Sequence, residues 1–223
     1  MVAAQPLGPE QAGRVYDRIG RLQDWQRFYE GPAVRDLEAY AGFDTARSVF
    51  ELGCGTGALA QRLLGRMLRG DAQYVGVDVS TTMVGLATNR VRSFGSRASV
   101  QQVSGRPPLP GADGTFDRFV AVYVFDLLPA ELASAMLAEA ARLLTATGLV
   151  CLVSLAEGET RASKALCRVW NRTWQLSPTL VGGCRPVDLV PLLADRWRVD
   201  HFATLTTWAV TSQVLVASPV ASE

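Results

Sequence analysis

The sequence has 223 residues, of which 48% are hydrophobic, and its 22 basic and 21 acidic residues leave a net charge of +1. This composition predicts one soluble globular domain with a sizeable core. It lacks the excess of positive charge that is typical of a nucleic-acid-binding protein. No apolar run reaches the length of a membrane span, no secretory signal is visible, and the four cysteines lack metal-site or disulfide spacing, so we expect a cytoplasmic protein with reduced thiols.

The N-terminal segment is predicted to be helical. Residues 1–9 are rich in proline and glycine and are expected to form a loose tail. A helical pattern then runs from Glu10 to about Tyr40, with a break expected near Gly31-Pro32. One face of this pattern is apolar and largely aromatic, and it is formed by Ile19, Leu22, Trp25 and Tyr29, with Phe28 beside them. Such a stripe usually belongs to a core.

A strand, a tight glycine turn and a helix are predicted next. The apolar run Ser48–Leu52 is followed by the alternating glycines of Gly53–Gly57, which let the backbone turn sharply and approach a ligand. About 20 residues later a second short strand, Tyr74–Val77, ends in Asp78, where a carboxylate can accept hydrogen bonds from a ribose diol. The pattern therefore predicts a site for a nucleotide-like ligand.

The type of ligand follows from the spacing of the glycines. The turn is Gly-x-Gly-x-Gly with Glu51 two positions before it, whereas a dinucleotide turn is usually Gly-x-Gly-x-x-Gly and faces a pyrophosphate. Residues Val49–Gly57, together with Gly76–Ser80, resemble the class I S-adenosylmethionine-dependent methyltransferases, in particular the type 11 and type 25 small-molecule branch. A nicotinamide-binding Rossmann domain and an ordinary glycine-rich turn are the alternatives.

The resemblance implies a set of cofactor contacts. The glycine turn is expected around the methionine part of the cofactor, the end of the second strand at the ribose hydroxyls, and the following helix against the adenine. The residues assigned in this way are Glu51, Gly53, Cys54, Gly55, Gly57, Asp78, Val79 and Met83. A Tyr-Asp pair often found in the N-terminal segment of such enzymes makes Tyr16 an expected lid contact, and Trp25 and Tyr29 are expected to face the acceptor.

The loop after the third predicted strand, near residues 98–103, departs from the family's pattern. Family members often have Gly-Asp-Ala there, and the acid bonds the adenine amino group, but this chain has Ser104, Gly105 and Arg106. We therefore expect these three residues to recognise adenine through backbone groups or the Ser104 hydroxyl. A strongly apolar strand, Phe119–Phe125, follows and places Tyr123 at the site.

Asp126 is the predicted catalytic residue. It follows the fourth strand at the mouth of the site, where it either takes a proton from the acceptor, binds the acceptor's charge, or caps the helix that begins after Pro129. Arg185 lies in a loop next to glycines and a proline, and it either anchors a carboxylate or phosphate of the acceptor or lies on the surface. The single histidine, His201, is expected to be structural.

The remaining elements complete an α/β fold. A fifth strand is predicted at Leu149–Leu155, a basic helix with two tryptophans at 160–176, and two final strands at Arg198–Phe202 and Thr207–Ala217. The alternation of strands and helices along the chain, together with the resemblance to class I methyltransferases, predicts a Rossmann-like sheet of seven mostly parallel strands, with helices on both faces and an antiparallel last strand. We expect a helical lid at residues 1–40 and a methyltransferase domain at residues 41–223, with a helical insertion at about 160–186.

The predicted function is transfer of a methyl group from S-adenosylmethionine to an O-, N- or C-nucleophile of a small molecule with an apolar or aromatic part. No metal is expected, because displacement at an activated methyl carbon depends mainly on positioning. The open alternatives are a lipid or quinone methyltransferase at a membrane surface, a nicotinamide-dependent oxidoreductase, and a protein that binds S-adenosylmethionine without catalysis.

Overall fold

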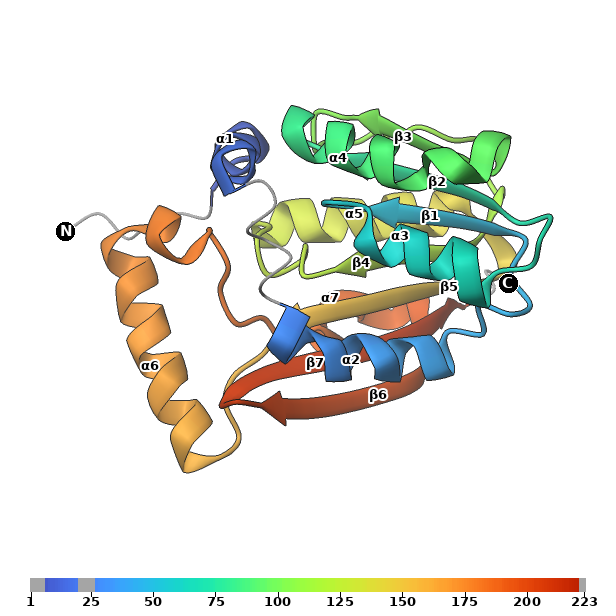
Figure 1. Ribbon diagram of the computed structural model, residues 1–223. Helices are drawn as coiled ribbons and strands as arrows, with labels where there is room; N and C mark the ends of the chain where they lie inside the picture. The colour runs from blue at the N-terminus through green and yellow to red at the C-terminus, as the bar shows by residue number, and fades with distance from the viewer. Residues whose placement is uncertain (1–6, 20–26, 221–223) are drawn as a thin grey trace.

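The computed structural model describes residues 7–19 and 27–220, and it shows one seven-stranded sheet with helices on both faces (Figure 1). The strands are β1 (Ser48–Leu52), β2 (Gln73–Asp78), β3 (Ala98–Gln102), β4 (Phe116–Val122), β5 (Leu144–Leu155), β6 (Trp197–Thr207) and β7 (Val210–Pro219). The α-helices are α1 (Pro9–Ile19), α2 (Arg27–Tyr40), α3 (Ala58–Arg62), α4 (Thr81–Val91), α5 (Ala130–Leu143), α6 (Arg161–Leu176) and α7 (Val190–Leu193). The short helical turns are η2 (Leu63–Met67), η3 (Arg92–Arg97), η4 (Pro178–Val181) and η5 (Ala194–Arg196). Within the described ranges, no helix combines the length and apolarity needed to cross a membrane.

The topology of the sheet confirms the predicted fold class. The strand order is β3-β2-β1-β4-β5-β7-β6. The pairs from β3 through β5 are parallel, and β7 runs antiparallel between β5 and β6. The carboxyl ends of β1 to β5 therefore meet at one edge of the sheet, which is where open α/β sheets bind their ligands.

Each face of the sheet has its own hydrophobic core. Helices α5 and α7 cover one face, while α2 and α3 cover the other. Alternate residues of a strand point to opposite faces, so β1 contributes Phe50 and Leu52 to the first core and Val49 to the second. Both faces of the central strands are thus apolar, as expected of parallel strands covered by helices on both sides.

The N-terminal region differs from the sequence prediction in two respects. The expected loose tail is shorter, because Leu7 is buried and α1 already begins at Pro9, a residue whose fixed φ suits the first helical turn. The expected break near Gly31-Pro32 is wrong, since α2 runs from Arg27 to Tyr40 with Pro32 inside it. Packing of the buried Leu37 against the sheet offsets the hydrogen bond that proline cannot donate.

The boundaries of β4 also differ from the prediction. The strand begins at Phe116 and ends at Val122, because Tyr123 adopts a φ of 55°, a left-handed conformation that an extended strand does not contain. The rest of the predicted apolar run forms a turn in which Phe125 is buried. Hydrophobicity therefore marks burial here rather than strand conformation.

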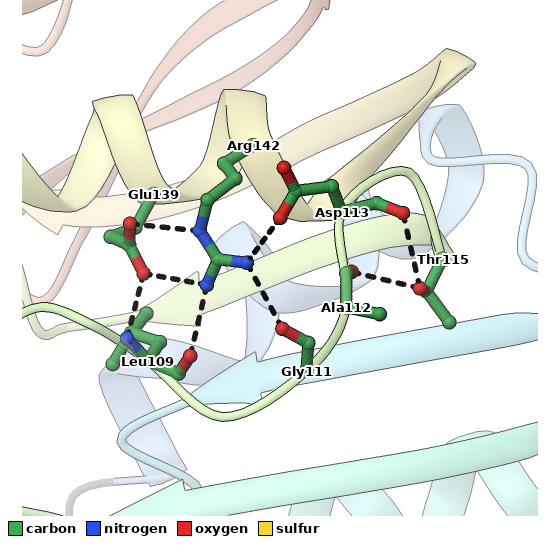
Figure 2. A network of polar contacts seen from close by, with 7 residues as sticks. All are labelled: Leu109, Gly111, Ala112, Asp113, Thr115, Glu139 and Arg142. Carbon is green, nitrogen blue, oxygen red and sulfur yellow. Dashed lines mark hydrogen bonds and ion pairs between the residues drawn. The ribbon is translucent and has the colours of Figure 1, made fainter.

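The loop between β3 and β4 has no helix and is held by Arg142 of α5 (Figure 2). The guanidinium donates to the carbonyl oxygens of Leu109 and Gly111 at 2.9 and 3.0 Å and pairs with Glu139 and Asp113, both at 2.8 Å. Glu139 also accepts the Leu109 backbone N–H at 2.7 Å. Because the Leu109 side chain is buried in the core, this network fixes the loop against the sheet.

Candidate cofactor and acceptor site

A cavity of about 90 Å³ lies at the carboxyl edge of the sheet, beneath α1. Its wall includes the ends of β1, β2 and β4, the loop after β3, and the start of α4. The predicted site residues that line it are Tyr16, Gly53, Gly55, Asp78, Val79, Met83, Gly105 and Tyr123. The fold thus brings together residues from five separate stretches of the chain.

The geometry of the turn at Gly53–Gly57 accounts for the glycines in its sequence. Gly53 has a φ of 69°, and a Cβ atom there would lie 2.5 Å from the Cγ2 atom of Val124. The backbone N–H groups of Gly53 and Cys54 donate to the Val77 carbonyl oxygen at 2.8 and 3.0 Å, which fixes the turn on β2. Cys54 and Gly57 do not line the cavity. The Cys54 thiol is buried, and a Cβ on Gly57 would lie 2.8 Å from Cα of Ala87, so Gly57 allows α3 and α4 to pack closely.

Asp78 ends β2 with its carboxylate in the wall of the cavity. One oxygen accepts the Gly55 N–H and the other accepts the Ser80 N–H, both at 2.9 Å. Burial raises the pKa of this carboxyl, although the two N–H groups favour its charged form. Each oxygen has a second lone pair, so the group can still accept hydrogen bonds from a diol. The donor set therefore fits the ribose of a nucleoside.

Glu51 does not point into this cavity. Its carboxylate accepts a hydrogen bond of 2.5 Å from the Tyr74 hydroxyl, and burial, as the largest cause, raises the pKa of Glu51 to about 8. The strand register makes this contact, because Glu51 pairs with Gly76 and Tyr74 lies two residues earlier on the same face. Gly76 is needed there, since a Cβ atom would lie 2.7 Å from the Tyr74 hydroxyl.

Helix α1 closes the cavity from above. Leu7, Pro9 and Ala12 line it beside Tyr16, and the Tyr16 hydroxyl lies 3.8 Å from the Cys184 sulfur. Of these four residues only Tyr16 was predicted as a site residue. Leu7, Pro9 and Ala12 were not predicted, and among them only Pro9, as a residue that favours the start of a helix, carried a signal in the sequence. Cys184 is 168 residues away from Tyr16 in the chain, so no local pattern connects them.

Asp17, the second residue of the Tyr-Asp pair, fastens α1 to α4. Its carboxylate accepts the Ser80 hydroxyl at 2.6 Å and the Thr82 N–H at 3.1 Å. The Ser80 oxygen in turn caps α4 by accepting the Met83 N–H. These contacts hold α1 at the N-terminus of α4, where a negative charge is favourable.

Asp126 lies in the turn after β4, and its side chain is fully buried. Neither carboxyl oxygen makes a well-formed hydrogen bond to a described residue, although the Cys184 thiol and the Leu155 N–H lie near it and favour its charged form. Burial outweighs these effects and raises the pKa of Asp126 to about 7. The capping hypothesis is wrong, because the N-cap of α5 is Pro129 and no side chain bonds there.

The other predicted site residues lie outside the cavity. Ser104 and Arg106 are exposed and bond to each other, with the Arg106 N–H donating to the Ser104 hydroxyl at 3.3 Å. Arg185 is tied to the turn after β4, because its guanidinium donates to the Leu128 carbonyl at 3.0 Å and its backbone N–H donates to the Asp126 carbonyl at the same distance. Trp25 and the side chain of Tyr29 lie outside the described residues.

His201 lies away from the cavity and joins β6 to α2. Its Nε2 atom is 2.7 Å from the Asp36 carboxylate, and its ring stacks on Tyr40 with centroids 3.6 Å apart. Among the described residues, no group of three histidine, cysteine or acidic side chains is placed to hold a metal ion.

A second cavity, of about 190 Å³, lies between α6 and the adjacent ends of β5 and β7. Its wall is mostly apolar and includes Leu155, Ala156, Leu166, Trp170, Pro186 and Val210. Leu155 and Trp170 connect this wall to the Asp126 region, since the Leu155 N–H lies near the carboxyl and the Trp170 indole donates to the Cys184 carbonyl at 2.8 Å. Asp126 and Cys184 line neither cavity, but both interact with the wall of each, since Tyr16 of the first cavity contacts the Cys184 sulfur and interacts electrostatically with Asp126.

Comparisons with known proteins agree with this geometry. The family model described as "Methyltransferase domain" matches residues 49–148. No curated protein matches the sequence significantly.

Solved structures share the fold over nearly the whole chain. The (4+2)-cyclase SpnF aligns with a TM-score of 0.72 at 15% identity, covering 99% of this chain and 100% of SpnF. The N-methyltransferase NodS from Bradyrhizobium japonicum, solved with S-adenosylhomocysteine, gives 0.70 at 15% identity over 93% and 98% of the two chains. Magnesium protoporphyrin IX methyltransferase from Synechocystis, also solved with S-adenosylhomocysteine, gives 0.67 at 20% identity over 94% and 99%.

The fold is that of an α/β protein of the Rossmann-like type, and its glycine-turn cavity has a wall that fits a nucleoside. Residues 49–148 match the model of a methyltransferase domain, and the neighbours NodS and magnesium protoporphyrin IX methyltransferase, which were solved with S-adenosylhomocysteine, share the fold of this chain. The match favours a methyltransferase over a nicotinamide-dependent oxidoreductase.

Proposed function

We propose that the protein transfers a methyl group to a small-molecule acceptor with an apolar or aromatic part, and that Asp126 acts as the general base or charge partner. The observation that carries the proposal is the fully buried Asp126 carboxyl, which has no well-formed hydrogen bond to a described residue. An unsatisfied buried carboxyl destabilises the folded protein, so its presence beside the walls of two cavities favours a functional role.

The apolar cavity beside α6 is the proposed place for the hydrophobic part of the acceptor. Its wall has few polar groups, among them the Ser163 and Thr211 side chains. A volume of about 190 Å³ suits a ring or a short alkyl group rather than a large polar molecule. The nucleophilic atom of such an acceptor would then lie on the Asp126 side, toward the cofactor.

S-adenosylmethionine supplies a methyl carbon that is activated by the adjoining positive sulfur. Asp78 and the glycine turn are the residues that would hold the nucleoside and the amino acid part, with Met83 against the adenine. Asp126 accepts the proton that an O–H or N–H acceptor loses, or balances the charge of an amine. Leu7 and helix α1 exclude water from the reaction, because Leu7 and the α1 residues Pro9, Ala12 and Tyr16 line the cavity.

We propose that the lid consists mainly of α1. In contrast, α2 packs against β5, β6 and β7 and carries the His201–Asp36 contact, so it belongs to the scaffold. A cavity of about 90 Å³ is smaller than the 300–1,000 Å³ typical of sites for drug-sized ligands. We therefore expect α1 to move when a whole nucleoside cofactor enters.

Hydrogen exchange is expected to show this motion. The backbone amides of α1 should exchange more slowly when S-adenosylhomocysteine is bound, because the ligand favours the closed position of the helix. Helix α2, which packs against β5, β6 and β7 and contributes no described residue to the cavity wall, serves as the internal reference and should not change. Equal exchange of α1 in the free and bound protein would show that it is fixed scaffold.

An acceptor screen tests the function itself. We expect isotopically labelled S-adenosylmethionine to give methylated products, read by mass, with apolar amines or phenols rather than with highly polar acceptors. Quinone-type and phospholipid acceptors belong in the same screen, since they distinguish a membrane substrate from a free one.

Ala156→Phe places a ring inside the apolar cavity and should raise KM for the acceptor while leaving S-adenosylhomocysteine affinity unchanged. Binding of S-adenosylhomocysteine without any product would favour a non-catalytic binding protein.

A further inference from the structure

Helix α6 stands beside the sheet with most of its surface in solvent (Figure 1). Of its 16 residues, Ser163 alone is buried. The helix is nevertheless well fixed, because Thr160 and Ser163 form a capping box and two indoles bond the following loop. Trp170 donates to the Cys184 carbonyl at 2.8 Å and Trp174 donates to the Gly183 carbonyl at 3.1 Å. An ordered helix with so little buried surface needs an explanation.

The outer surface of α6 carries two adjacent stripes. Spacings of three and four residues place four exposed cations on one flank, and they are Arg161, Lys164, Arg168 and Arg172. None of the four forms an ion pair with another described residue. The neighbouring flank is apolar and exposes Leu166 by 37%, Val169 by 61% and Leu176 by 83%. The helix contains no acid, although Glu157 and Glu159 precede it.

The turn between β6 and β7 displays another apolar side chain next to α6. Trp208 is 79% exposed, and its neighbours Ala209 and Val210 line the same cavity as Leu166 of α6. Both turn residues have left-handed backbones, with φ of 51° at Trp208 and 64° at Ala209. A two-residue turn of this kind favours Asn-Gly, so a tryptophan and an alanine are held there against their preference. The strain points to a role for the indole side chain.

We propose that α6 and the Trp208 turn form a docking surface for an anionic membrane. A helix with cations beside an apolar stripe lies in the lipid headgroup region, with its apolar side chains toward the acyl chains and its cations on the phosphates. Tryptophan favours the same interface because it has an apolar ring and a polar N–H group. Charge complementarity selects this occupant over a second copy of the chain, because pairing two α6 surfaces would bring their cations together.

The docking surface also adjoins the apolar cavity, since Leu166 belongs to both. If the proposed function is correct, an acceptor with an apolar chain would reach the cavity from the membrane surface. Docking itself does not depend on methyl transfer, so a binding measurement separates the two proposals.

Vesicle flotation of the full-length protein tests the docking surface. The protein is expected to float with vesicles that contain phosphatidylglycerol but not with vesicles of phosphatidylcholine alone, and sodium chloride should weaken the binding. The double variant Arg168→Glu/Arg172→Glu should lower the partition coefficient by at least about 25-fold, because each cation near an anionic surface contributes a factor of roughly 5 and the variant removes two of them. Trp208→Ser should also lower it, without changing the charge.

The matched control is Arg47→Glu/Arg66→Glu, which makes the same charge change on exposed residues outside α6 and the turn. It should bind vesicles nearly as well as the unchanged protein, and circular dichroism should show that all variants are folded. The proposal is overturned if the protein does not float with anionic vesicles, or if the control loses binding to the same extent. It is also overturned if sedimentation shows a dimer that the Arg168→Glu/Arg172→Glu variant loses, because a second copy would then cover the surface.

Discussion

Turnover is expected to fall by about 10²- to 10⁴-fold when Asp126 is replaced by asparagine, while affinity for S-adenosylhomocysteine stays the same. Asparagine has nearly the same shape but cannot accept a proton from the acceptor. The residue does not line the cofactor cavity, which is why cofactor binding should not depend on it. Steady-state kinetics with an acceptor from the screen, together with calorimetry, measures both quantities.

The pH dependence of the same variant gives a second readout. Because burial raises the pKa of Asp126 to about 7, the folded protein keeps this proton between about pH 4 and pH 7, where the unfolded chain has released it. The free energy of unfolding should therefore fall as the pH rises through this window, by at most about 1.4 kcal/mol per pH unit, and this slope should be absent in Asp126→Asn. Turnover of the unchanged protein should rise through about pH 7, since a base must be deprotonated.

The matched control is Asp44→Asn, the same change at an exposed position. It should alter neither turnover nor the slope of stability with pH. A change in melting temperature for Asp126→Asn with unchanged turnover would assign Asp126 a structural role and contradict the proposed mechanism.

Cofactor binding is expected to be lost in Gly55→Val and weakened in Asp78→Ala. Gly55 has a φ of 51°, so a β-branched residue there is strained, and its side chain would enter the cavity. Asp78→Ala removes the acceptor for the ribose diol and should cost about 1–3 kcal/mol of binding free energy. It also leaves the Gly55 N–H without its partner, which loosens the turn further.

Calorimetry with S-adenosylhomocysteine checks both variants. Gly70→Val serves as the control for the first, because a Cβ atom at Gly70 meets nothing within 4 Å and its φ is not left-handed. Asp44→Ala serves for the second. If both site variants bound with unchanged affinity, the assignment of this cavity to the cofactor would be wrong.

Much of the fold was predictable because local patterns and topology agree. The apolar runs ending in Leu52, Asp78 and Leu155 fix the positions of β1, β2 and β5 at the site, and the alternation with helices fixes their parallel order. The end of β4 was not predictable. Its apolar run continues into a buried turn, and only the left-handed backbone at Tyr123 ends the strand. Hydrophobicity alone cannot report a single dihedral angle.

The candidate site was predictable where a motif determines the backbone. Gly53, Asp78 and Met83 line the cavity as expected, because the turn, the strand end and the helix start follow one another in the chain. The direction of Glu51 was not predictable, since it depends on the diagonal pairing with Tyr74 on β2. Contacts between distant segments, such as Tyr16 with Cys184, depend on the whole fold and have no local signature.

Ser80 has a consequence for how closure and binding are coupled. Its backbone N–H donates to Asp78, the proposed ribose acceptor, while its hydroxyl donates to Asp17 on α1 and accepts the Met83 N–H. A ligand that hydrogen-bonds to the Asp78 carboxylate therefore contacts a residue that is bonded to Ser80, and Ser80 also forms the hydrogen bond to Asp17 that holds α1 in place. If the bound ligand strengthens the Ser80–Asp17 hydrogen bond, the closed position of α1 must raise the affinity for the ligand by the same free energy, because such coupling is reciprocal. A single serine would then give the enzyme an ordered sequence of events, in which the cofactor arrives first and the closed lid completes the acceptor site.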